Sequence, residues 1–408
     1  MSKICPFRAL RPSEESAPRV SSVPYDVVST DEARALAADN PLSFLHVTRA
    51  EIDLPAGTDP YDASVYAKAK SALAGITAAA PLVHEAEPSL YLYRLVMGSH
   101  AQTGLAACYS VDEYDNDLIK KHERTRRDKE DDRTRHITTT RAQTGVVFLT
   151  YRASAEIDAV AAEVAADAPL YDFTSEDGIR HTVWKVTGEP MHRLVAGFDR
   201  LPCLYIADGH HRAASAARTR AKLRDEGASV DAPVGDWNRF LAVAFPHDQM
   251  QVLPYHRVVR DLRGSGPAEF LARLAEHVKV LPGPPIPARK GLVGMYLAGR
   301  WYTLELPPAA DGSTYAGLDV ARLQETVLTP LLGIEDPRTD KRIDFVGGIR
   351  GTRELERRVD SEEMAVAFAM VPVSVEDLMA IADEGGIMPP KSTWFEPKLR
   401  DGLLVHQF

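Results

Sequence analysis

The feature that most constrains the fold is a strand that passes through a short polar turn directly into a helix. Residues 201–207 (LPCLYIA) have the length and apolar character of a buried strand, and residues 213–224 read as a helix that ends near Gly227. The turn between them is Asp208, Gly209, His210, His211 and Arg212. Polar residues at such a joint make it a candidate site as well as a structural unit.

Strand and helix patterns are interspersed along the rest of the chain. Residues 90–96 and 103–110, joined by the turn at 97–100, predict a hairpin, as do 292–297 and 301–306. Further strands are expected at 145–151, 181–186 and 365–373, and helices from Asp31 (with Ser29 or Thr30 as N-cap) and at 155–166, 268–278, 318–332 and 375–383. These patterns predict an α+β (mixed α/β) fold.

The length of 408 residues argues for two or three domains. The composition shifts after Asp261, and residues 281–287 are so rich in proline that we expect a connecting loop there. We therefore expect a catalytic portion at 1–261, with the charged segment 117–141 and the unit 201–227, and an α/β portion at 262–408 that contributes the loop 385–398.

The charge balance bears on the partners of the chain. Lys and Arg number 48 against 58 Asp and Glu, a net charge of −10, which argues against nucleic acid and anionic membranes as partners. An anionic ligand must then be held by a local basic site. There is no signal-peptide pattern, no run of 18 apolar residues and no cysteine spacing typical of a metal site, so we expect a cytoplasmic protein. A homodimer is left open.

The turn at 208–212 is the first candidate site. A helix N-terminus presents unpaired N–H groups and the positive end of the helix dipole, which attract phosphate. Gly209 allows close approach, Arg212 can bind phosphate oxygens in pairs, and Asp208 can hold a divalent metal or accept a proton. His210 and His211 add groups that titrate near neutral pH. The alternative is that Asp208 only caps the helix and the histidines lie on the surface.

The second candidate is the charged stretch 119–133, the densest group of cations in the chain. Its candidate residues are Lys121, His122, Glu123, Arg126, Lys129 and Arg133. Among these cations Glu123 would be ionised, as a general base must be. If the stretch is helical, however, its alternating charges could equally form a solvated surface.

The third candidate lies near the C-terminus. Phosphate could be contacted here by Lys391, Ser392, Thr393 and Lys398. The stretch is not a P-loop, because Pro389 and Pro390 lack the N–H groups that such a loop uses to bind phosphate. The alternative is that it forms a packed C-terminal clamp. Arg350, in the glycine-rich turn 344–351, is a further donor. The chain has no GxSxG, HExxH or early GxGxxG motif, so the sites of α/β-hydrolases, zincins and Rossmann dehydrogenases lack their signatures.

The same stretches resemble a known family. Residues 6–10, 24–28, 40–47, 121–123, 206–212 and 389–395 are similar to the signatures of a bacterial and archaeal family catalogued as a domain of unknown function, along essentially the whole chain. The turn 208–212 also resembles the Asp-Gly-His-Thr-Arg motif of free-serine kinases with a ParB/sulfiredoxin-like fold. This resemblance implies a ParB-like core with N- and C-terminal elaborations, and pyrophosphate-dependent phosphorylation of free serine.

By this resemblance Asp208 matches the kinase aspartate near metal and substrate, while His210 and Arg212 match its phosphate-holding pair. His211 replaces a threonine, and Glu123 is our choice for the base. We therefore expect a serine kinase that uses Mg²⁺, with serine and pyrophosphate or a nucleotide as substrates. Two alternatives remain: a ParB-like nucleotide-binding switch and a phosphohydrolase that uses the same residues.

Overall fold

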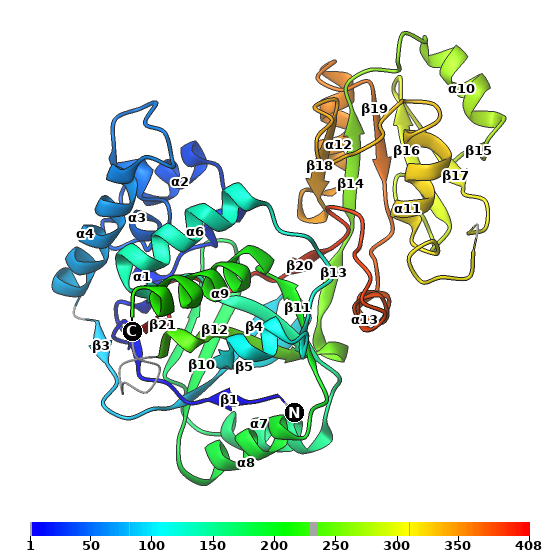
Figure 1. Ribbon diagram of the computed structural model, residues 1–408. Coiled ribbons are helices and arrows are strands. Elements are labelled where there is room, and N and C mark those ends of the chain that lie inside the picture. The colour runs from blue at the N-terminus through cyan, green and yellow to red at the C-terminus, as the bar shows by residue number, and fades with distance from the viewer. Residues whose placement is uncertain (1, 81, 228–235, 310) are drawn as a thin grey trace. The chain divides into compact units, whose positions relative to one another are not determined.

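The chain divides into two compact units. In the computed structural model, residues 2–80, 82–227, 236–309 and 311–408 are described. Unit 1 runs to Met250 and also includes Pro397–Phe408, whereas unit 2 is Gln251–Glu396 (Figure 1). This division differs from the expected one at Asp261. Strand β14 (Tyr255–Val259) lies inside the sheet of unit 2, and β21 (Val405–Gln407) returns to pair with strands of unit 1.

Unit 1 is built on two sheets. Among the described residues, the larger sheet has nine strands, β1 (Ile4–Cys5), β4 (Leu90–Met97), β5 (His100–Ser110), β6 (Ile119–Lys120), β8 (Val147–Tyr151), β9 (Tyr171–Thr174), β10 (Arg180–Val186), β11 (Leu204–Asp208) and β12 (Arg239–Pro246). Their order is β6-β11-β8-β12-β5-β4-β10-β9, with β1 beside β5. The smaller sheet has the order β3 (Val83–His84), β2 (Ala9–Arg11), β21 and β7 (Ala142–Gln143).

Helices surround the sheets of unit 1. They are α1 (Ala17–Val20), α2 (Thr30–Ala37), α3 (Leu45–Thr48), α4 (Ala63–Ala79), α5 (Val111–Asp115), α6 (Arg127–Thr140), α7 (Ala155–Val164), α8 (Gly188–Asp199) and α9 (His210–Asp225). Ser29, one of the two expected N-caps, caps α2 in a capping box with Glu32, in which each side chain bonds the other residue's N–H. Helix α6 lies alongside α9 (Figure 1). All five residues of β8 are buried, as in a strand covered on both faces.

In the described part of unit 2, six strands form a sheet in the order β15 (Lys279–Pro282), β17 (Arg300–Glu305), β16 (Leu292–Leu297), β19 (Val366–Ala369), β14 and β18 (Ile343–Gly347). Strands β13 (Gln251–Leu253) and β20 (Trp394–Glu396) pair separately. The helices are α10 (Pro267–Ala275), α11 (Asp319–Leu323), α12 (Gly351–Asp360) and α13 (Val375–Asp383). Pro282 was expected in a loop but ends β15, because an edge strand needs no N–H at that position.

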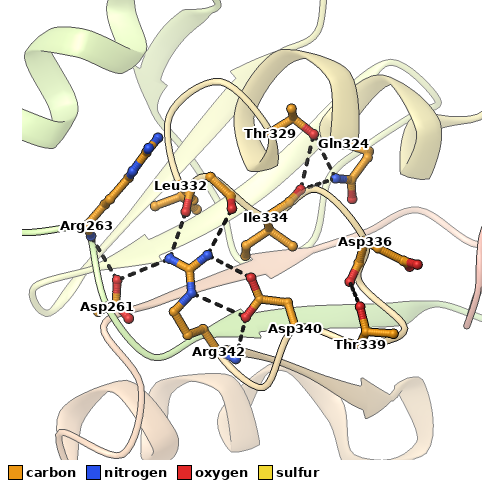
Figure 2. A network of polar contacts seen from close by, with 11 residues as sticks. Asp261, Arg263, Gln324, Thr329, Leu332, Ile334, Asp336, Thr339, Asp340 and Arg342 are labelled. Carbon is orange, nitrogen blue, oxygen red and sulfur yellow. Dashed lines mark hydrogen bonds and ion pairs between the residues drawn. The ribbon is translucent and has the colours of Figure 1, made fainter.

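The helix expected at 318–332 is shorter than predicted. Helix α11 gives way to a π-turn at Gln324–Leu328, and Pro330 has no N–H to continue it. Side chains then satisfy the carbonyls beyond the helix: Arg342 donates to Leu332 and Gly333, at 3.0 and 2.9 Å (Figure 2). Gln324 donates to the carbonyl of Ile334 in the same network.

The predicted mixed α/β class is confirmed: helices and strands alternate along both units. Among the described residues, no helix combines the length and the apolar character that crossing a membrane requires.

Candidate functional site

The turn after β11 has the strand-turn-helix form that the sequence predicts. Strand β11 ends at Asp208 and α9 begins at His210. Gly209 between them has φ +90°, a conformation in which a side chain would be strained. Among the described residues no side chain caps the start of α9 through a hydrogen bond, and the positive end of the helix dipole lies at this turn.

Asp208 forms an ion pair with a lysine from the C-terminal segment. Lys398 Nζ lies 2.9 Å from Asp208 Oδ2, and the Gly209 N–H donates to Asp208 Oδ1 at 2.8 Å. Burial opposes ionisation of Asp208, but the charges of Lys398 and Arg212 outweigh it and hold the pKa of this carboxyl well below its usual range. Asp208 is therefore a fixed negative charge, and the structure brings together two residues from distant candidate stretches.

Pairing of β6 with β11 places the segment after β6 beside this turn. The two strands are parallel, with Ile119 opposite Leu204 and Lys120 opposite Tyr205. The chain that leaves β6 therefore carries His122 to His210: their ring centroids are 4.5 Å apart and the rings are nearly perpendicular. The His122 N–H donates to His210 Nε2 at 3.5 Å. Potential ligand atoms of His122, Glu123 and His210 all lie within 4.8 Å of one another.

Both histidines of this contact are buried, with 2% of His122 and 5% of His210 exposed. Burial lowers the pKa of His122 to about 4 and holds the pKa of His210 well below its usual range. Both imidazoles are therefore neutral at pH 7. His210 was predicted to hold phosphate, and in this state it can do so as a hydrogen-bond donor but not as a cation.

The charged stretch is not one continuous helix. Helix α6 begins only at Arg127, so Glu123 lies in the preceding irregular segment and not on a helix face with Arg126 or Arg127. The reason is the strand pairing of Ile119 and Lys120, which depends on β11 and not on the local charge pattern. His211 Nε2 accepts a hydrogen bond from the Arg126 N–H at 3.0 Å, which joins this segment to α9.

The cations of this stretch contact their own neighbours. Lys121 Nζ donates to the Tyr114 carbonyl at 2.8 Å and lies 2.6 Å from Asp117 Oδ1. In the same way Arg126 pairs with Asp128, Lys129 donates to the Tyr61 hydroxyl and Arg133 pairs with Asp132. These contacts fit the solvated-surface alternative for Arg126 better than a phosphate cradle, since its side chain is 70% exposed.

Arg212 points into unit 1 and is buried. Its guanidinium donates to both carboxylate oxygens of Asp26, at 2.7 and 2.8 Å, and to the Val146 carbonyl at 2.6 Å. The ring of Tyr25 lies 5.6 Å away. The resemblance implies that Arg212 binds phosphate directly. For that, its guanidinium would have to break its hydrogen bonds to Asp26.

Asp26 and Asp401 are site residues that sequence reasoning missed. Asp401 is 1% exposed, and burial raises its pKa to about 7 despite the nearby charge of Arg212. The sequence does contain a signal for Asp26, because residues 24–28 are among the stretches that resemble the family signatures. That resemblance, however, assigns no chemical role to Asp26. Asp401 carries no local signal.

Comparison with known proteins identifies the family. The chain matches, over residues 4–321, the family described as protein of unknown function (DUF1015). It belongs to the DUF1015 family. No curated protein matches it.

Some solved structures are similar to this DUF1015 chain. A free serine kinase variant in complex with AMP has 12% identity and a TM-score of 0.37, with 73% of this chain and 92% of that chain covered. SbnI from Staphylococcus aureus, truncated at its C-terminus, has 13% identity, a TM-score of 0.38 and coverages of 74% and 87%. A conserved hypothetical protein from Pyrococcus furiosus has 13% identity, a TM-score of 0.34 and coverages of 73% and 94%.

The remaining predicted residues of this DUF1015 protein belong to unit 2. Arg350 is exposed where the turn after β18 meets α12, and Lys391 is exposed with its Nζ 5.6 Å from the ring centroid of Tyr255. The Ser392 hydroxyl donates to the Pro389 carbonyl at 2.6 Å, and Thr393 follows directly. Their phosphate-binding role stays a prediction, whereas Lys398 of the same stretch belongs to unit 1.

Proposed function

We propose that this DUF1015 protein is a phosphotransferase that converts free L-serine to O-phosphoserine, with pyrophosphate or a nucleotide as donor and with Mg²⁺. One observation carries the proposal: the ionised Asp208 and Lys398 face each other at the open N-terminus of α9. A fixed anion, a cation and the positive end of a helix dipole together suit a metal-bound phosphate chain.

The reaction forms one bond and breaks one. The serine hydroxyl oxygen attacks the terminal phosphorus of the donor, the bond to the leaving phosphate or nucleotide breaks, and the hydroxyl proton passes to a carboxylate. We assign that base to Glu123, and the N–H groups of α9 with Lys398 neutralise charge on the moving phosphoryl group. Arg212 acts as a positioning residue, because its bonds to Asp26 and Val146 hold the start of α9.

The residues at this turn fit Mg²⁺. The ion prefers one or two carboxylates together with substrate phosphates and water, and Asp208 supplies an ionised carboxylate. When bound, Mg²⁺ would neutralise charge on the donor phosphates. Lys398, held beside Asp208, supplies a cation for a phosphate oxygen of the donor.

A donor panel tests the proposal. Purified protein is incubated with L-serine and Mg²⁺ and, in separate reactions, pyrophosphate, ATP or ADP, and the products are followed by phosphorus NMR. Formation of O-phosphoserine with at least one donor supports the kinase. Phosphate release that does not depend on serine would instead indicate a phosphohydrolase. A protein that forms no product, but whose melting temperature a nucleotide raises, would indicate the nucleotide-binding switch.

A further inference from the structure

The ring of His122 is buried and its ring nitrogens are poorly satisfied. Only 2% of the residue is exposed, and among the described residues neither Nδ1 nor Nε2 has a partner with full hydrogen-bond geometry, although the Ile206 carbonyl is near enough to interact with the ring. A buried polar atom without a partner destabilises a protein by about 1–3 kcal/mol, so native structures contain few of them. The hydrogen bond from the His122 backbone N–H to His210 does not involve a ring nitrogen of His122.

The groups around His122 are metal-ligand types. Its ring lies against that of His210, and the carboxylate of Glu123 completes a cluster in which all three potential ligand atoms lie within 4.8 Å. An ion with bonds of about 2.0–2.2 Å holds such atoms roughly 3–3.5 Å apart. The parallel pairing of β6 and β11 holds the two backbones beside each other, so binding one ion requires the ligand atoms to approach by only about 1–2 Å.

We propose that His122, Glu123 and His210 bind one first-row transition-metal ion of the Zn²⁺ or Mn²⁺ class. Two imidazole nitrogens and one carboxylate oxygen suit these ions, whereas Mg²⁺ prefers oxygen ligands alone. Three protein ligands leave at least one coordination position open, as in catalytic metal sites. Glu123 can bind the ion through one carboxylate oxygen, and its second oxygen can still accept the serine proton. The metal site is therefore compatible with the proposed function but does not depend on it.

Metal binding is measured on the full chain without substrates. The protein is stripped with EDTA, dialysed and titrated with Co²⁺, whose visible absorption reports nitrogen and oxygen ligands; Zn²⁺ is then added as a competitor. We expect one ion per chain, loss of the Co²⁺ spectrum on addition of Zn²⁺, and no displacement by Mg²⁺. Glu123→Gln and His122→Gln should each weaken binding at least about tenfold.

The control is His192→Gln, a histidine with 70% of its side chain exposed on α8, which should bind as the unchanged protein does. Circular dichroism and melting temperature establish that each variant folds. If His122→Gln does not fold, Glu123→Gln still tests the site, because Glu123 is only partly buried. A folded wild-type protein that binds no Co²⁺, or equal binding by all variants, overturns the proposal. Because turnover is not measured, this result is independent of whether the donor panel yields phosphoserine.

Discussion

Lys398 Nζ lies 2.9 Å from Asp208 Oδ2, although 190 residues separate the two in the sequence. The contact is possible because Pro397–Phe408 folds back into unit 1, where β21 pairs with β2 and β7. The C-terminal segment is thus part of the candidate site and not an appendage of unit 2.

Removing either member of this pair should impair turnover. We expect Asp208→Asn and Lys398→Met each to lower kcat/KM for phosphoserine formation about 10²–10³-fold, since both groups face the proposed phosphate position. The double variant should lose little more than either single variant, because the two act as a unit. Lys290→Met is the matched control: this exposed lysine of unit 2 pairs with Asp377, and its loss should leave kcat/KM within about twofold. If the Asp208→Asn variant kept full activity, Asp208 would have no role in catalysis and only a structural one.

Arg212 should matter for stability. Its guanidinium is buried against Asp26 and Val146, so Arg212→Met leaves a buried carbonyl and a carboxylate without their donor. We expect the free energy of unfolding to fall by about 3–5 kcal/mol in urea denaturation. Arg338→Met, which breaks an exposed pair with Asp336, should change it by less than about 1 kcal/mol. Equal effects of the two substitutions would contradict a positioning role for Arg212.

The strand-turn-helix unit could be predicted because its signal is local. An apolar run, a glycine joint and a helical stretch follow one another in the sequence, and the structure places β11, Gly209 and α9 accordingly. The structure of the charged stretch 119–133 could not be predicted in the same way: its alternating charges are compatible with a helix, but pairing with β11 makes Ile119–Lys120 a strand. That competition involves residues more than 80 positions away, which a charge pattern does not encode.

Stability should fall in acid through His181. This residue is fully buried, with Nδ1 2.8 Å from the Tyr93 hydroxyl and Nε2 accepting from Arg400. Burial, and then the charge of Arg400, lowers its pKa to about 3. The unfolded chain binds this proton near pH 6.5 and the folded chain only near pH 3, so stability is fully present above 6.5 and is lost between these values.

The slope of the free energy of unfolding against pH measures the contribution of His181. Between pH 6.5 and about 3, His181 should contribute a loss of about 1.4 kcal/mol per pH unit to the free energy of unfolding. The His181→Gln variant should be less stable than the wild-type protein at pH 7, and its free energy of unfolding should change less with pH. A variant whose slope equals that of the wild-type protein would exclude His181 as the cause.

The fold-back of the C-terminal segment can be tested at a glycine. Gly402 has φ +89°, and a Cβ there would lie 2.7 Å from Cγ of Phe44, which is fully buried. Gly402→Ala should therefore lower the free energy of unfolding by about 2–4 kcal/mol. Gly75→Ala in α4, where a Cβ meets nothing within 4 Å, should instead raise it by about 0.5–1 kcal/mol. Similar changes at both positions, measured by urea denaturation, would argue against the packing at Gly402.

The parts of the candidate site that sequence reasoning missed are tertiary. Lys398 was predicted as a phosphate contact, but nothing near it in the sequence points to Asp208. The partner of Arg212 also escaped prediction, since a carboxylate at position 26 acquires its role only when Arg212 of α9 reaches it. Likewise, the His122 and His210 rings meet because two strands pair, so the cluster proposed to bind a metal has no signature in either stretch alone.

Phosphorus NMR of purified protein with L-serine, Mg²⁺ and each donor in turn tests the central claim most directly. The proposed function predicts a new O-phosphoserine resonance with pyrophosphate or a nucleotide, dependent on serine and absent with Asp208→Asn. Folded wild-type protein that forms no phosphoserine from any of these donors would contradict it.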